Sequence, residues 1–112
     1  MDRALGGLGI DGHLDVVTAT LPGADPRLAA EEIVWSCHLD HPRPGANDNA
    51  SGCATDLEVA RTLAKLVRDG ALPPPLRTLR FVFPPEVEGT LSLLAFRPEL
   101  AGRIRAAIHL DM

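Results

Sequence analysis

The chain has 112 residues, of which 46% are hydrophobic and 23% are charged, and its formal net charge is -4 at pH 7. This length fits one small domain around a single core, and the composition argues against disorder. The negative charge, the lack of a basic run and the few aromatic residues exclude nucleic acid as an expected partner. No apolar stretch of the sequence has the length of a signal-peptide core or of a membrane span. We therefore predict a cytoplasmic protein with no membrane partner.

Four segments have the composition of β-strands, because they are rich in β-branched, aromatic or other apolar residues. They are residues 15–20, 32–39, 78–83 and 104–110. Residues 1–31 are interpreted as a loose lead-in plus the first strand, which is close enough in sequence to the second strand to pair with it antiparallel. Residues 32–112 form the second predicted unit.

Two segments are predicted to be helical. Residues 50–69 repeat apolar side chains at spacings of three and four, and Gly70 is placed to end this helix. Residues 90–96 predict a shorter helix that breaks before Pro98. Strands and helices alternate from residue 32 onward, which predicts parallel strands joined by right-handed crossovers. The expected fold class is α/β, a three-layer sandwich with a mixed, largely parallel sheet.

The two cysteines are not expected to form a disulfide framework. Cys37 falls in a predicted strand and Cys53 in a predicted helix, and each is interpreted as a small buried hydrophobic side chain. Cys37 and His38 are neighbours in a strand and point to opposite faces, so they do not form a nucleophile–base pair.

Residues that can bind a metal gather at the ends of the predicted strands. Parallel strands end at one edge of the sheet, which is where α/β proteins usually build their sites. Several carboxylates around one imidazole raise one another's pKa unless a cation is bound, and a mixed nitrogen and oxygen ligand set suits zinc. The residues are His38 and Asp40 after the second strand, Asp48 at the start of the long helix, Glu86 and Glu88 after the third strand, and Asp111 after the fourth.

Four segments in a fixed order carry a family resemblance. They read HLD at 38–40, PGANDNASG at 44–52, RFVF at 80–83 followed by glutamate, and LDM at 110–112. In this order they resemble the co-catalytic di-zinc exopeptidases of metallopeptidase family twenty-eight, relatives of bacterial leucyl aminopeptidase, glutamate carboxypeptidase and glutaminyl cyclase. The resemblance covers residues 32–112 and implies the N-terminal part of a zinc-peptidase-like catalytic domain.

The resemblance implies a role for each matching residue. His38 and Asp111 would bind one zinc ion, and Asp48 would bridge this ion and a second one. Asp40 would orient the imidazole of His38, because ligating histidines usually donate their other N–H to a carboxylate or carbonyl.

Where the family has two consecutive glutamates, a general base and a zinc ligand, this chain reads Glu86-Val87-Glu88. We assign Glu86 as the base and Glu88 as the ligand, and the opposite assignment stays open. Residues two apart in extended backbone point to one side, so both glutamates would face the metals.

The resemblance also implies a downstream histidine for the second zinc ion, whereas the sequence ends at Met112. We therefore interpret the chain as a fragment that carries an incomplete site. His109, two residues before Asp111, has little weight as a substitute ligand. His13 and His41 are interpreted as surface residues.

The leading hypothesis is an aminopeptidase-like exopeptidase that hydrolyses peptide substrates with water activated by two zinc ions, inactive or incomplete as this fragment. One alternative is a non-catalytic α/β module with a degenerate metal site. Another is glutaminyl cyclisation or deacylation on the same scaffold.

Overall fold

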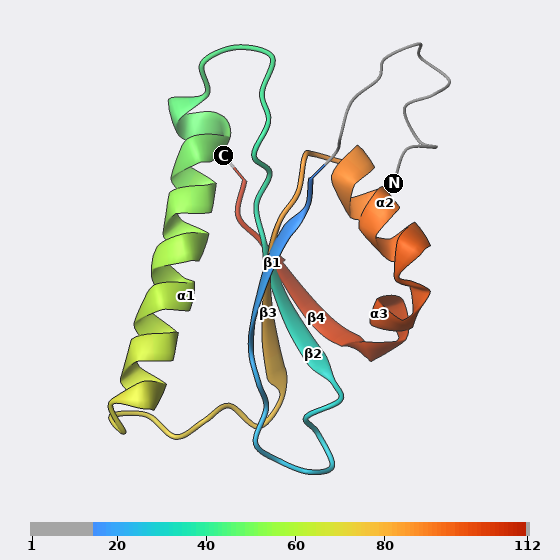
Figure 1. The fold of residues 1–112 in the computed structure, drawn as a ribbon. Helices are drawn as coiled ribbons and strands as arrows, with labels where there is room; N and C mark the ends of the chain where they lie inside the picture. The colour runs from blue at the N-terminus through green and yellow to red at the C-terminus, as the bar shows by residue number, and fades with distance from the viewer. Residues whose placement is uncertain (1–14, 112) are drawn as a thin grey trace.

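A computed structural model describes residues 15–111, which form three layers around one sheet (Figure 1). Helix α1 (Gly52–Arg68) covers one face of the sheet, and helices α2 (Glu88–Phe96) and α3 (Pro98–Arg103) lie on the other face. The strands are β1 (Val17–Leu21), β2 (Glu32–Ser36), β3 (Thr78–Phe83) and β4 (Ile104–His109). The predicted three-layer α/β architecture is confirmed.

The sheet is mixed, with the strand order β1-β3-β2-β4. Strand β2 pairs in parallel with both β3 and β4, whereas β1 pairs antiparallel with β3. The expected pairing of the first strand with the second is therefore wrong, because both edges of β2 are already occupied. The connection after β1 also bonds to the start of β3 and to the segment before it, through Gly23 N to Thr78 Oγ1 at 3.0 Å and Ala24 N to the carbonyl oxygen of Pro75 at 2.8 Å.

The hydrophobic core lies between the sheet and α1. Cys37, Phe81 and Phe83 are buried there, and Trp35 stacks on Phe81 with ring centroids 6.3 Å apart. Apolar side chains of α1, among them Leu63, pack against this cluster. The periodicity predicts the inward face of the helix only in part, because Ala60 and Leu63 pack on the core whereas Leu57 is 61% exposed.

The helix boundaries follow local chemistry. Gly70 adopts a positive φ of 75° just after α1, a conformation that favours glycine at the end of a helix. Helix α3 is absent from the sequence prediction, although Pro98 at its first turn is a good helix start. Its six residues are too few for a periodic pattern to identify.

The interpretation of the two cysteines as separate hydrophobic residues is wrong, because Cys37 and Cys53 form a disulfide. Cys37 lies just beyond β2 and Cys53 lies in the first turn of α1, so both face the same interior. Their Cα atoms are 5.1 Å apart, which is within the usual range for a disulfide. The bond joins the strand that leads to His38 with the helix that follows Asp48.

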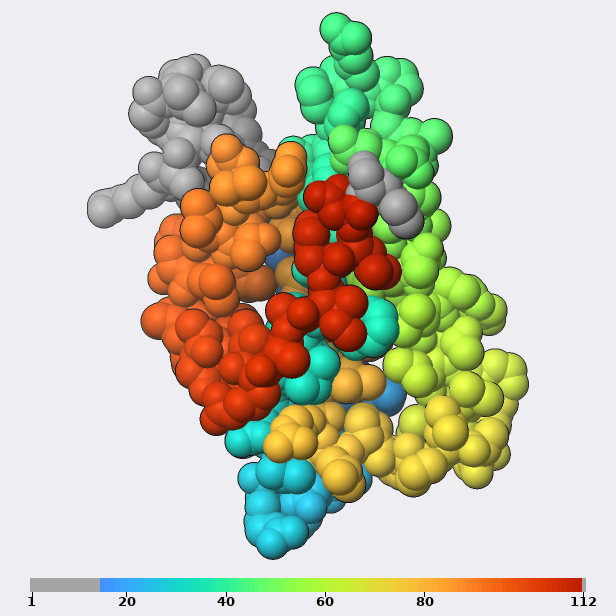
Figure 2. All heavy atoms as spheres, turned by 180° about the vertical axis from the view of Figure 1, so that it is seen from behind, coloured from blue at the N-terminus to red at the C-terminus, as the bar shows by residue number. Residues whose placement is uncertain are grey.

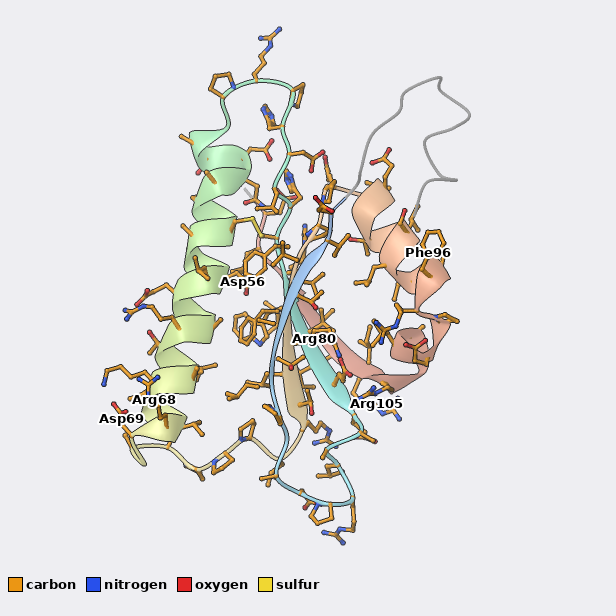
Figure 3. All side chains as sticks on the ribbon, viewed as in Figure 1. Asp56, Arg68, Asp69, Arg80, Phe96 and Arg105 are labelled. Atoms are coloured by element: carbon orange, nitrogen blue, oxygen red, sulfur yellow. A yellow bond between two sulfur atoms is a disulfide. The ribbon has the colours of Figure 1, made fainter. Side chains whose placement is uncertain are left out.

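A buried carboxylate joins the sheet to the layer formed by α2 and α3. Glu32 has no solvent exposure, and it accepts hydrogen bonds from Arg80 Nε at 2.5 Å and pairs with Arg103 at 2.9 Å. The two guanidinium groups stabilise the ionised form, so the Arg80 hydrogen bond lowers the pKa of Glu32 despite its burial. In Figure 3, Arg80 lies on the sheet, and Asp56 projects from α1 toward the sheet.

Strand β4 is an edge of the sheet and is largely exposed. Figure 2 shows its residues at the surface between α1 and the layer formed by α2 and α3. Within residues 15–111, no helix has the length and apolar character needed to cross a bilayer.

Candidate metal centre

The parallel strands β2, β3 and β4 end at one edge of the sheet, and the predicted site residues follow these ends. His38 lies just beyond β2, Glu86 beyond β3 and Asp111 beyond β4. Asp48 lies in the irregular turn Ala46–Ser51 that leads into α1. The topology therefore brings residues from four separate segments to the same edge.

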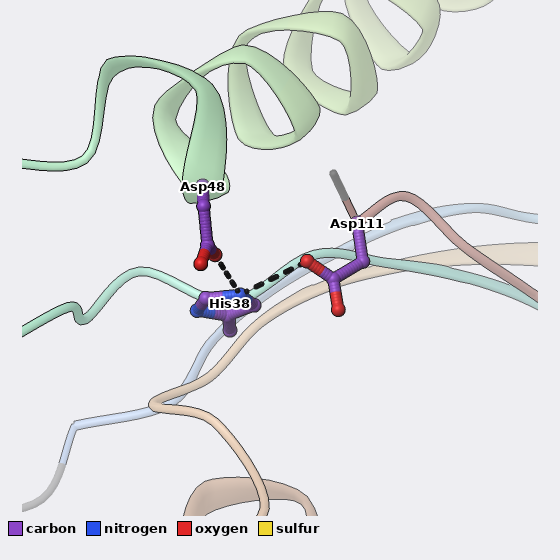
Figure 4. Close-up of side chains that lie close together, drawn as sticks. All are labelled: His38, Asp48 and Asp111. Carbon is purple, nitrogen blue, oxygen red and sulfur yellow. Dashed lines mark hydrogen bonds and ion pairs between the residues drawn. The ribbon is translucent and has the colours of Figure 1, made fainter.

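Three of these side chains converge on one point (Figure 4). Nε2 of His38 is 3.0 Å from Oδ1 of Asp48 and 3.3 Å from Oδ1 of Asp111. One ligand atom from each of the three residues lies within 4.8 Å of the others. His38 is buried, whereas the two carboxylates are partly open to solvent.

These separations fit a bound divalent cation. Tetrahedral zinc has ligand distances of about 2.0–2.1 Å, which places two ligand atoms about 3.3 Å apart. One imidazole nitrogen and two carboxylate oxygens form a ligand set that zinc accepts, and three protein ligands leave one position for water or substrate. The donor chemistry of the three residues and the distances from Nε2 of His38 to the two carboxylates are both suitable.

The imidazole of His38 is fixed by its other nitrogen. Nδ1 lies 2.9 Å from the backbone carbonyl oxygen of Asp40, which accepts its hydrogen bond and leaves Nε2 to face the carboxylates. Burial alone would lower the pKa of His38, but the carbonyl of Asp40 and the carboxylate of Asp111 outweigh burial and raise the pKa. A cation bound at Nε2 would replace the proton that these acceptors favour.

Asp40 contacts the ring of His38 through its backbone carbonyl and not through its carboxylate. Its Oδ1 is 4.0 Å from Nδ1 of His38, so the backbone carbonyl of the same residue orients the ring instead. This Oδ1 accepts a hydrogen bond from the backbone N–H of Glu86 at 2.5 Å. Asp40 therefore connects the loop after β2 with the loop after β3.

The two glutamates after β3 have unequal positions. Glu86 lines a pocket of about 400 Å³ together with His38, His109 and Leu91, and its negative charge acts on His38. Glu88 is the first residue of α2 and its side chain is exposed. The expected extended backbone is wrong here, because Val87 adopts a φ of 22° and the helix begins directly after it. Neither glutamate belongs to the His38, Asp48 and Asp111 group.

Asn49 has a role that was not predicted from the sequence. Its side chain is buried, and Nδ2 donates a hydrogen bond to the carbonyl oxygen of Leu110 at 2.7 Å. This bond holds the residue before Asp111 against the start of α1. Gly52 is needed beside it, because a Cβ there would lie 2.0 Å from Asn49 Oδ1 and 2.6 Å from the Leu110 oxygen.

Two further histidines lie near the centre. His41 is a surface residue, as we interpreted it, and its Nε2 also lies 3.3 Å from Oδ2 of Asp48. His109 bonds to Ser36 Oγ through Nδ1 at 2.8 Å, and its Nε2 is 3.8 Å from Asp111 Oδ2. His13 lies outside the described residues.

A model of peptidase family M28 matches residues 16–112, nearly the whole chain. The chain belongs to peptidase family M28. At the level of the family, this M28 chain is a metal-dependent peptidase, a hydrolase whose substrates are peptides. The resemblance found in the four ordered segments is confirmed. A search of curated proteins gave no match.

Proposed function

We propose that this M28 chain carries the metal centre of an aminopeptidase-like exopeptidase that uses two zinc ions. The observation that carries the proposal is the convergence of His38, Asp48 and Asp111 at separations that suit zinc ligands. Glu86 lines the same pocket as His38, which supports its assignment as the general base. The family supplies the reaction class, and the finer assignments are our proposal.

The residues would divide the work as follows. His38, Asp48 and Asp111 would hold a zinc ion, which supplies an activated water and polarises a peptide carbonyl when bound. Glu86 would accept the proton of the attacking water and pass it to the leaving amine. The carboxylate of Asp40 would hold Glu86 in place by accepting the hydrogen bond of the Glu86 backbone N–H at 2.5 Å. We keep Glu88 as the proposed ligand of the second ion. Its side chain is exposed and would have to adopt another rotamer to reach that ion.

The position of Glu88 in the first turn of α2 favours one alternative, a non-catalytic module with a degenerate second metal position. Glutaminyl cyclisation or deacylation would use the same His38 group. These functions differ in what is hydrolysed or cyclised, so substrate assays separate them.

The test is hydrolysis of amino-acid p-nitroanilides by the zinc-loaded chain, compared with cyclisation of N-terminal glutaminyl peptides. We expect p-nitroanilide hydrolysis that is lost in Glu86→Gln while zinc content is retained, and lost together with zinc in Asp111→Asn. Asp69→Asn is the control, because this exposed carboxylate at the end of α1 pairs with Lys65 far from the site. Zinc binding without any hydrolysis would favour the non-catalytic module, and cyclisation alone would favour the cyclase.

A further inference from the structure

The carboxylate of Asp48 has an imidazole at each of its oxygens. Oδ1 is 3.0 Å from Nε2 of His38, and Oδ2 is 3.3 Å from Nε2 of His41. A cation between each nitrogen and its nearest oxygen would leave Asp48 shared by two cations. The second pair has the separation of about 3.3 Å that two ligands of tetrahedral zinc require.

The two imidazoles are anchored in the same way. Nδ1 of His38 is 2.9 Å from the carbonyl oxygen of Asp40, and Nδ1 of His41 is 2.7 Å from the carbonyl oxygen of Arg43. Metal-binding histidines usually donate their second ring N–H to such an acceptor, which leaves the Nε2 lone pair for the metal. The backbone nitrogen of Arg43 is also 3.1 Å from Nδ1, so His41 can adopt the other tautomer when no cation is bound.

We propose that His41 is a metal ligand, and that it binds a second divalent cation together with Oδ2 of Asp48. The inference rests on the proposed function, because it uses the bridging role of Asp48. In the structure this pair brings two protein ligand atoms together, without Glu88, whereas the His38 group brings three together. The second cation therefore binds more weakly than the first and keeps more positions for water or for a peptide group.

The surroundings of His41 allow a cation to enter from solvent. Its side chain is 30% exposed, in contrast to 3% for His38. Both rings line an open pocket of about 400 Å³, which also includes Asn49. His109 is a poorer candidate, since its Nε2 is 3.8 Å from the nearest carboxylate oxygen of Asp111 and its Nδ1 bonds to Ser36. His109 is therefore the matched control for His41.

The first experiment is a zinc titration of the whole metal-free chain by calorimetry, with bound zinc counted by mass spectrometry. We expect the wild type to bind two ions of unequal affinity. His41→Asn should lose the weaker ion and keep the affinity of the stronger one within about threefold, because His38 keeps its own ligand group. His109→Asn should bind both ions as the wild type does. Two ions in His41→Asn, or loss of the weaker ion in His109→Asn, would overturn the proposal.

The second experiment identifies the ligand directly. In His41→Cys the thiolate would replace the imidazole, so the cobalt-loaded protein should show a sulfur-to-cobalt charge-transfer band that wild-type protein lacks. The absence of this band, in a variant that still binds cobalt at His38, would overturn the role of residue 41.

The outcomes also separate this inference from the function on which it rests. A wild-type chain that binds a single ion, lost in His38→Asn and unaffected in His41→Asn, overturns the His41 site and leaves the first metal site intact. A wild-type chain that binds no zinc overturns both.

Discussion

Asn49 is the residue that connects the two carboxylates of the metal centre across the structure. Its buried amide bonds to the carbonyl oxygen of Leu110 at 2.7 Å. Asp48 precedes Asn49 and Asp111 follows Leu110, so one hydrogen bond fixes the distance between the segments that carry these two ligands. Loss of the bond would let the ligands separate, and it would leave the carbonyl oxygen of Leu110 without this donor.

Asn49→Ala is therefore expected to weaken zinc binding by about 10–100-fold, the range seen when groups that orient metal ligands are removed. The measurement is the zinc dissociation constant by calorimetry. Asn47→Ala is the control, because Asn47 flanks Asp48 on the other side and is exposed. Equal zinc affinities in the two variants would contradict the positioning role of Asn49.

Asp56 is a second informative residue, since its carboxylate is buried without a hydrogen-bond partner among the described residues. It projects from α1 toward the sheet (Figure 3). Burial raises the pKa of Asp56 to about 6, although His109 partly offsets the effect. The folded protein thus holds this proton more tightly than the unfolded chain does.

The stability of the fold should consequently fall as the pH rises from about 4 to 6, and this contribution should then stay constant. The raised pKa corresponds to about 3 kcal/mol. Asp56→Asn should remove this dependence and be more stable than the wild type above pH 6. Urea unfolding of both proteins across this range is the measurement. A stability difference between them that does not change with pH would show that Asp56 is not protonated by burial.

At the scale of elements, the disulfide between Cys37 and Cys53 fastens the end of β2 to the first turn of α1. The loop that the disulfide closes includes the proposed metal ligands His38, His41 and Asp48. The sulfur of Cys53 also lies 3.1 Å from the carbonyl oxygen of His38. Closing a loop of about 15 residues restricts the unfolded chain and stabilises the fold by about 3 kcal/mol.

Reduction with a phosphine should lower the free energy of unfolding of the wild type by about this amount. The double variant with Cys37→Ala and Cys53→Ala should be less stable than the oxidised wild type and should not respond to the reductant. Chemical unfolding with and without reductant provides the comparison. Two titratable thiols in the unreduced, denatured wild type would contradict the disulfide.

Sequence patterns identified most elements because their signals are local. β-branched and aromatic residues predicted the strands, and the third strand has the predicted bounds, residues 78–83. The partner of β1 and the disulfide could not be predicted, because each depends on which segments lie side by side in space. Helix α3 is too short to show a periodic pattern in the sequence. The start of α2 at Glu88 could not be predicted either, because it depends on a positive φ at Val87 that this residue type rarely adopts.

At the scale of the whole molecule, parallel topology explains why candidate ligands could be predicted from separate stretches of sequence. His38 and Asp111 follow parallel strands, and Asp48 precedes the crossover helix, so the order of elements alone brings them to one edge. His41 could not be predicted because it has no partner pattern in the sequence, and Asn49 could not because asparagine is common in turns and helix caps. Only the contacts with Asp48 and Leu110 distinguish them.

The central claim, that His38, Asp48 and Asp111 bind one metal ion, is tested most directly by anomalous diffraction at the zinc edge. Crystals of the zinc-loaded chain should give a peak about 2.0–2.2 Å from Nε2 of His38 and from a carboxylate oxygen of each aspartate. Zinc peaks only elsewhere, with Nε2 of His38 still bonded to the carboxylates, would contradict the account.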